Sequence, residues 1–155
     1  MTTAPRATQP VLDRAVAAAP TTAPSLLSCP VDTSASASAV IGPRGGTLHV
    51  GRFAIAIPRG AVAEPTTFTF DVPASEYLEI NVHAAGVAHY FFDRAVTVTI
   101  DYSRCGGDVK AKDFDAWYID SETRSPIAKM HGHAMPRQEL FLFRTDHLSR
   151  YAIAD

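Results

Sequence analysis

The tripeptide His147-Leu148-Ser149 places an imidazole and a hydroxyl on either side of one leucine near the end of the chain. In this spacing His147 can act as a general base toward the Ser149 hydroxyl, whose oxygen then attacks the carbonyl carbon of Leu148. The amide becomes an ester, which water hydrolyses, and the chain is cut between Leu148 and Ser149. The reaction requires a strained peptide that rigid neighbouring strands hold in place.

The same tripeptide also has a purely structural interpretation. His147 can cap a turn through a side-chain hydrogen bond while Ser149 satisfies a backbone group, and the residues from Tyr151 then pack as the last strand. A cleaved tail from Ser149 to Asp155 would be retained by few hydrogen bonds and little buried area. We therefore expect no enzymatic activity, and self-cleavage through His147 and Ser149 remains the alternative.

A second pair of chemically useful side chains is His131 and His133, which flank a glycine and lie on one side of the chain where it is extended. Imidazole is a common ligand of zinc, and His49, His83 and His89 are available as further ligands. The competing interpretation is a solvated hairpin with Gly132 at its tip. Because no carboxylate or thiol stands nearby in a matching register, we expect no metal and no cofactor. A metal site at His131 and His133, or a carbohydrate site near Trp117, stays as an alternative.

The chain contains only two cysteines, Cys29 and Cys105, and each stands beside a proline or a glycine in loop-like sequence. Free thiols of structural proteins are more often buried in apolar strands. We therefore expect a Cys29–Cys105 disulfide that ties the N-terminal segment to the folded region. Such a bond forms in an oxidising compartment, so the predicted location is secreted or at the cell surface.

Composition and charge exclude several partners. The net charge is -2 with no long run of either sign, so we expect no nucleic-acid partner. No segment has the 18 or so apolar residues of a membrane-spanning helix. Residues 1–39 contain five of the eleven prolines and are otherwise rich in alanine, threonine and serine. This composition predicts a disordered leader or linker over 1–39, before one folded domain over 40–155.

From residue 40 onward, short runs of alternating apolar and polar residues are separated by glycine, proline, aspartate and serine. The clearest run is Ala95 to Tyr102, in which Val96, Val98 and Ile100 face one way. About nine such strands without any helical period predict an all-β fold, an antiparallel sandwich of two sheets. The other expected strands are Thr47–Val50, Phe53–Ile57, Thr66–Val72, Leu78–His83, His89–Phe92, Trp117–Asp120, Ile127–Met130, Glu139–Thr145 and Tyr151–Ala154.

Four segments resemble the ZU-five domain family, which takes its name from zonula occludens and the uncoordinated netrin receptors. The first is Ile41-Gly42-Pro43-Arg44-Gly45-Gly46-Thr47-Leu48, followed by Ile57-Pro58-Arg59-Gly60-Ala61-Val62. The others are Phe91-Phe92-Asp93-Arg94-Ala95-Val96-Thr97-Val98 and the terminal His147-Leu148-Ser149-Arg150-Tyr151-Ala152. The resemblance covers most of residues 40–154, and the proline-rich leader is similar to the secreted bacterial branch.

The resemblance implies a sandwich that serves as an interaction or scaffolding module. We therefore expect a non-catalytic, extracytoplasmic protein-interaction module whose protein partner the sequence does not name. Self-cleavage and ligand binding are the alternatives.

Overall fold

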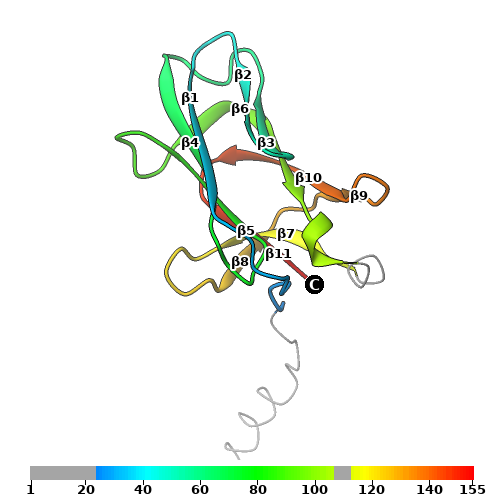
Figure 1. Cartoon of the computed structure of the whole chain (residues 1–155). Coiled ribbons are helices and arrows are strands. Elements are labelled where there is room, and N and C mark those ends of the chain that lie inside the picture. Colours follow the sequence, from blue (N-terminus) through cyan, green and yellow to red (C-terminus); the bar gives the residue numbers. More distant parts are fainter. Residues whose placement is uncertain (1–23, 107–112) are drawn as a thin grey trace, which may run out of the picture.

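The computed structural model describes residues 24–106 and 113–155, which form two antiparallel β-sheets packed face to face (Figure 1). The six-stranded sheet has the order β1 (Ala35–Ile41), β4 (Thr66–Val72), β5 (Glu79–Ala84), β11 (Arg150–Ala154), β7 (Asp115–Ile119) and β8 (Pro126–Lys129). The five-stranded sheet has the order β2 (Gly46–Val50), β3 (Phe53–Ile57), β6 (Phe91–Asp101), β10 (Leu140–His147) and β9 (His133–Met135). A short 3-10 turn, η2 (Ser103–Cys105), follows β6. The predicted all-β sandwich is confirmed.

The core lies between the sheets and is built by the alternation seen in the sequence. Val96, Val98 and Ile100 of β6 are fully buried, as predicted, and they pack in the same cluster as Ile80 and Val82 of β5. Because side chains alternate across a strand, the residues between them point outward. Strand β10 shows the same pattern and pairs with β6 along most of its length. These two long strands place the end of β10 beside the start of β6.

The first strand begins before the predicted domain boundary. Strand β1 starts at Ala35 and pairs residue by residue with β4, so the boundary between 39 and 40 falls inside a strand. Alanine and serine at 35–39 hide the strand from a search for large apolar residues, although their backbone pairs as well as any other. The part of the leader over 1–23 lies outside the described residues.

Two further strand predictions need correction. His89–Phe92 is not a strand of its own, because β6 begins at Phe91 and continues without a break to Asp101. The hairpin expected with Gly132 at its tip does not form, because β8 and β9 on its two sides belong to different sheets and β9 pairs with β10. Within residues 24–106 and 113–155 the sandwich therefore has eleven strands, where about nine were expected.

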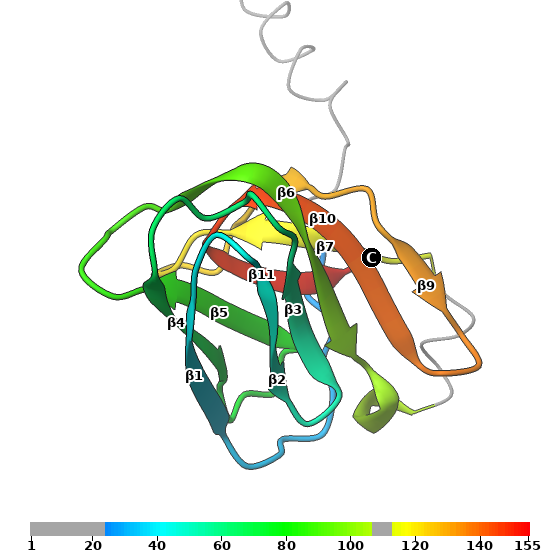
Figure 2. The same cartoon turned by 90° about the horizontal axis from the view of Figure 1, so that it is seen from above.

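The segment before β1 is fastened to the sandwich at its end. Leu26 forms an isolated antiparallel bridge with Ala154, and Ser28 forms one with Tyr77. The amide of Leu27 donates to the carbonyl of Ile153 over 2.8 Å. This segment follows the six-stranded sheet before the chain turns into β1, as Figure 2 shows from above.

Cys29 and Cys105 form a disulfide, with their Cα atoms 4.6 Å apart, which confirms the predicted pairing. Cys29 is 5% exposed and belongs to the core cluster. The bond ties the N-terminal segment to η2 at the end of β6.

The turn between β1 and β2 depends on one glycine. Gly45 has a positive φ of 79°, and a Cβ at this position would collide with the carbonyl oxygen of Ile57. Only glycine adopts this conformation without strain and allows the strand end to approach so closely. No helix within the described ranges is long and apolar enough to cross a bilayer.

Candidate functional site

The tripeptide His147-Leu148-Ser149 carries the chain from one sheet to the other. His147 ends β10 in the five-stranded sheet, and β11 begins at Arg150 in the six-stranded sheet. Leu148 is 6% exposed and its amide donates to the carbonyl of Tyr90 over 3.0 Å. The carbonyl of Ser149 accepts a hydrogen bond from the amide of Val82. Both sides of the Leu148–Ser149 peptide are therefore anchored to neighbouring strands.

The His147 imidazole packs among aromatic rings and does not contact the Ser149 side chain through a hydrogen bond. Its ring centre is 6.1 Å from that of Phe91, 5.3 Å from that of Tyr118 and 6.1 Å from that of Tyr151. Its Nδ1 is 3.3 Å from a carboxylate oxygen of Asp146. In the described part of the chain, no hydrogen bond joins the side chains of His147 and Ser149.

The hydroxyl groups of Tyr151 and Thr145 form hydrogen bonds at the segment His147–Ser149, which we call the β10–β11 crossing. The Tyr151 hydroxyl donates to the carbonyl of His147 over 2.7 Å. The Thr145 hydroxyl lies 3.0 Å from the Tyr151 hydroxyl. Burial raises the pKa of the Tyr151 phenol above its ordinary value, so this group remains a protonated donor into the alkaline range. Thr145 is itself 5% exposed. The buried hydroxyl pair fixes the end of β10, where the pairing with β6 shifts register between Thr145 and His147.

A strained peptide would have supported cleavage, but the backbone torsions place positive φ elsewhere. In the described ranges the non-glycine residues with positive φ are Arg124, His131 and Glu139, none of which belongs to the crossing. Residues 24–106 and 113–155 also contain no cis peptide bond.

A groove of about 450 Å³ opens beside the crossing, on the side of β5 and β7. Leu148, Ser149, Tyr118 and Tyr90 all contribute to its wall. Large apolar side chains stand exposed around it, with Val87 43%, Ile127 53% and Phe91 69% exposed. Val87 and Ile127 line the groove itself, and Phe91 is linked to it through the contacts of His147 with Phe91 and Tyr118.

Asp120 supplies a fixed negative charge to the same groove. Its carboxylate accepts hydrogen bonds from the backbone amides of Thr123 and Glu122, at 2.9 and 2.8 Å. These bonds favour the ionised form and lower the pKa of Asp120. The loop between β7 and β8 is thereby ordered at the groove edge.

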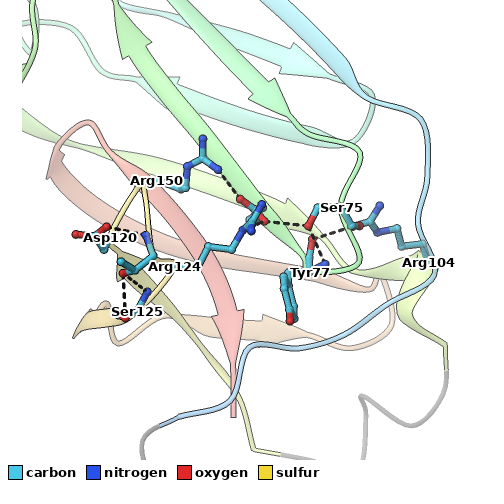
Figure 3. A network of polar contacts seen from close by, with 9 residues as sticks. Ser75, Tyr77, Arg104, Asp120, Arg124, Ser125 and Arg150 are labelled. Atoms are coloured by element: carbon cyan, nitrogen blue, oxygen red, sulfur yellow. Dashed lines mark hydrogen bonds and ion pairs between the residues drawn. The ribbon is translucent and has the colours of Figure 1, made fainter.

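A buried carboxylate, Glu79, lies on the outer side of the six-stranded sheet, and the sequence did not reveal it. Its side chain is fully buried, and its two oxygens accept from Arg150 Nη1 at 2.6 Å and Arg124 Nε at 2.7 Å. Ser75 Oγ donates to Glu79 Oε2 over 2.9 Å. Arg104 extends the network by donating to the carbonyls of Ser75 and Tyr77 (Figure 3). The two arginines neutralise the charge of Glu79, so we regard this cluster as structural.

The metal alternative gains no cluster of ligands. His131 and His133 are both exposed and line a shallow hollow of about 290 Å³, whereas His83 and His89 line the groove beside the crossing. His83 and His89 therefore lie in a different place, and His49, in β2, lines neither hollow. Within residues 24–106 and 113–155, no three His, Cys, Asp or Glu side chains are grouped as a metal site requires.

The residues proposed for a metal site and for a carbohydrate site have structural roles. A carboxylate oxygen of Asp115 accepts from the amide of Gly132 over 2.9 Å, which fixes the turn between the two histidines. Trp117 lies in β7 opposite Ala152 and Lys129, half-buried, with its indole nitrogen buried and unpaired in the described chain. A half-buried ring embedded in a sheet offers a smaller flat surface to a sugar than an exposed one.

Comparison with known proteins leaves the resemblance untested, since no protein-family model and no curated protein matches this chain. The ZU-five resemblance therefore remains a prediction based on the motifs themselves.

Proposed function

We propose that this protein is a non-catalytic, extracytoplasmic β-sandwich of ZU-five type that binds another protein through the groove beside the β10–β11 crossing. The observation that carries the proposal is the pair of exposed apolar side chains that line that groove, Val87 and Ile127. Exposed apolar side chains gathered around a concave surface are typical of binding sites, because their burial by a partner is favourable.

The groove also offers polar groups that orient a partner. Asp120 and Arg150 lie in its lining together with Tyr118 and Tyr90. Aromatic and apolar side chains provide the buried area, while a few charged groups set orientation and select among partners. The disulfide between Cys29 and Cys105 is compatible with the extracytoplasmic location.

Binding is favoured over self-cleavage because His147 is engaged elsewhere. Its nitrogen Nδ1 lies within 3.4 Å of the Thr145 hydroxyl and within 3.3 Å of Asp146, and its ring contacts three aromatic side chains. A general base must reach the proton that it abstracts, here that of the Ser149 hydroxyl. The absence of positive φ at the crossing also leaves the required strain without support.

The test compares wild type with Val87→Asp and Ile127→Asp as baits against extracellular and envelope fractions of the source cells. Val31→Asp is the matched control, because Val31 is 64% exposed and does not line the groove. We expect one protein to be retained by wild type and by the Val31 variant and to be lost with both groove variants. Equal retention by all four proteins, repeated with the purified partner, would refute the groove as the binding surface.

A further inference from the structure

Strand β1 is an edge strand that lacks the usual protection against pairing. It has seven residues, Ala-Ser-Ala-Ser-Ala-Val-Ile, without proline, glycine or charge, and its register with β4 has no bulge. Proteins normally block such edges with charged residues, proline, bulges or very short strands, because the free N–H and C=O groups recruit other chains. Within the described ranges the backbone of β1 pairs only with β4.

The edges β8 and β9 show the protection that β1 lacks, and the remaining edge, β2, is shorter than β1. Strand β8 contains Pro126 and Lys129 and pairs irregularly with β7. Strand β9 has three residues, and β2 has five and begins with Gly46. The contrast within one molecule indicates that β1 is kept open for an occupant.

The outer side of β1 adds a second observation. Its outward residues are Ser36, Ser38 and Val40, and all three are exposed. Val40 is 67% exposed. Val40 would be partly covered if another strand lay beside β1.

The sequence of β1 allows full-length pairing with a second copy in one antiparallel register, and no side chain opposes it by charge. Pairing about Ser38 sets Ser38 opposite Ser38 of a second copy, Ser36 opposite Val40, and Ala37 opposite Ala39. A strand keeps its inner and outer faces only when its register shifts by an even number of residues. Among such registers, only the one centred on Ser38 pairs all seven residues. No charge opposes another charge in this arrangement.

We propose that β1 pairs with β1 of a second copy of this chain, antiparallel and centred on Ser38, so that the two six-stranded sheets become continuous. The contact is isologous, as in most two-fold symmetric dimers. It goes beyond the proposed function, because no residue of β1 lines the groove. The paired strands alone bury little area, so we expect a dissociation constant on the order of 100 μM.

Single cysteines introduced into β1 of the full-length protein test both contact and register. With a short bismaleimide linker we expect Ser38→Cys to join to itself, and Ser36→Cys to join to Val40→Cys when the two are mixed. Ser36→Cys alone should stay largely monomeric. Thr67→Cys, exposed on β4 and opposite Val40 within the sheet, is the matched control and should not be joined to itself. Peptide mapping confirms that Cys29 and Cys105 keep their native bond.

Disruption is tested in solution by sedimentation velocity between about 10 μM and 1 mM, a range that brackets the expected dissociation constant. Val40→Lys sets a charge at each end of the paired strands and should weaken association at least tenfold. Val31→Lys, a similarly exposed valine that lies outside both β1 and the groove, should leave association unchanged.

Three outcomes would overturn the proposal. The first is a Ser38→Cys protein that stays monomeric at 1 mM. The second is linking of every single-cysteine variant to the same extent, which indicates random collision. The third concerns a photo-reactive group carried on the introduced thiol of the Ser38→Cys protein. Its attachment to residues 1–23 of its own chain, rather than to β1 of a second copy, would show that the edge has a different occupant.

Discussion

Glu79 depends on its partners more than any other charged residue of the described sandwich, because its carboxylate is fully buried between two arginines. Removal of one member of a buried ion pair leaves the other charge uncompensated, at a cost of about 3–5 kcal/mol. We expect Glu79→Gln to lower the free energy of unfolding by about 3 kcal/mol, measured by urea denaturation. Glu64→Gln at an exposed position is the control and should change little.

The partners of Glu79 should rank by exposure. The Arg150 side chain is 22% exposed and that of Arg124 is 42% exposed. Solvent screens the more exposed pair, so Arg124→Gln should cost less than about 1 kcal/mol and Arg150→Gln clearly more. The reverse order would show that the arginine from the β7–β8 loop, rather than the one in β11, carries the interaction.

Ser149 separates the structural from the catalytic interpretation of the crossing. If the tripeptide is structural, the wild-type chain runs as one full-length species and Ser149→Ala costs at most about 0.5–1.5 kcal/mol. Intact-mass measurement decides between the interpretations.

The contrary result is equally distinct. A free amino terminus at Ser149 in wild type, lost in Ser149→Ala without unfolding, would make the protein its own protease.

The residue scale also marks the limit of sequence-based prediction. The disulfide could be predicted because only two cysteines exist and both stand in loop-like sequence. Glu79 could not, since its partners Arg124 and Arg150 lie 45 and 71 residues away and no local pattern connects them. The exposed side chain of Phe91 was likewise hidden, because in the sequence it reads like any other residue of an apolar strand.

At the scale of elements, the disulfide joins the N-terminal segment to η2 across a sequence separation of 76. Closing a loop of that length lowers the entropy of the unfolded chain, which stabilises the folded state by about 4.5 kcal/mol. This value is an upper limit, because strain in the native bond reduces it. We expect the double variant Cys29→Ser and Cys105→Ser to lose about 2–4 kcal/mol of unfolding free energy.

A matched measurement distinguishes the covalent effect from packing. Wild type reduced under native conditions should unfold at the same urea concentration as the double serine variant. A reduced wild type as stable as the oxidised form would contradict the entropic account.

Large apolar residues in alternation predicted most strands, and their absence explains the errors. Strand β1 was assigned to the leader because alanine and serine have low strand propensity, yet its backbone pairs fully with β4. Strand β9 has only three residues, too few to show a period. The register shift near the end of β10 depends on Thr145 and Tyr151, which meet only once both sheets have formed.

For the whole molecule, buried tyrosines set the response to alkali. Burial raises the pKa of Tyr151 and of Tyr102 in the folded protein, while in the unfolded chain tyrosine ionises near pH 10. The unfolded state therefore releases protons first as the pH rises. The contribution of these groups is fully present below about pH 10 and declines above it.

We expect these groups to leave the free energy of unfolding, measured with urea, constant between about pH 7 and 9. Above about pH 10 that free energy should fall steeply. Tyr151→Phe should be less stable at neutral pH, because it loses the bond to the His147 carbonyl, and should decline less steeply in alkali. An unchanged slope in the variant would show that Tyr151 is not the group responsible.

The meeting of Ser25 and Asp155 determines how the domain responds to mechanical force. The Asp155 amide donates to the Ser25 carbonyl and the Ser25 amide to the Asp155 carboxylate, each over 3.2 Å, and Leu26 bridges Ala154 in antiparallel orientation. Traction on these two points peels the end strands apart, so hydrogen bonds break one after another instead of sharing the load. The peeling from the N-terminal side stops at Cys29, since the disulfide shields everything up to Cys105 from tension. At about 3.5 Å per residue, that shielded loop stores roughly 270 Å of extension, released only when the bond is reduced.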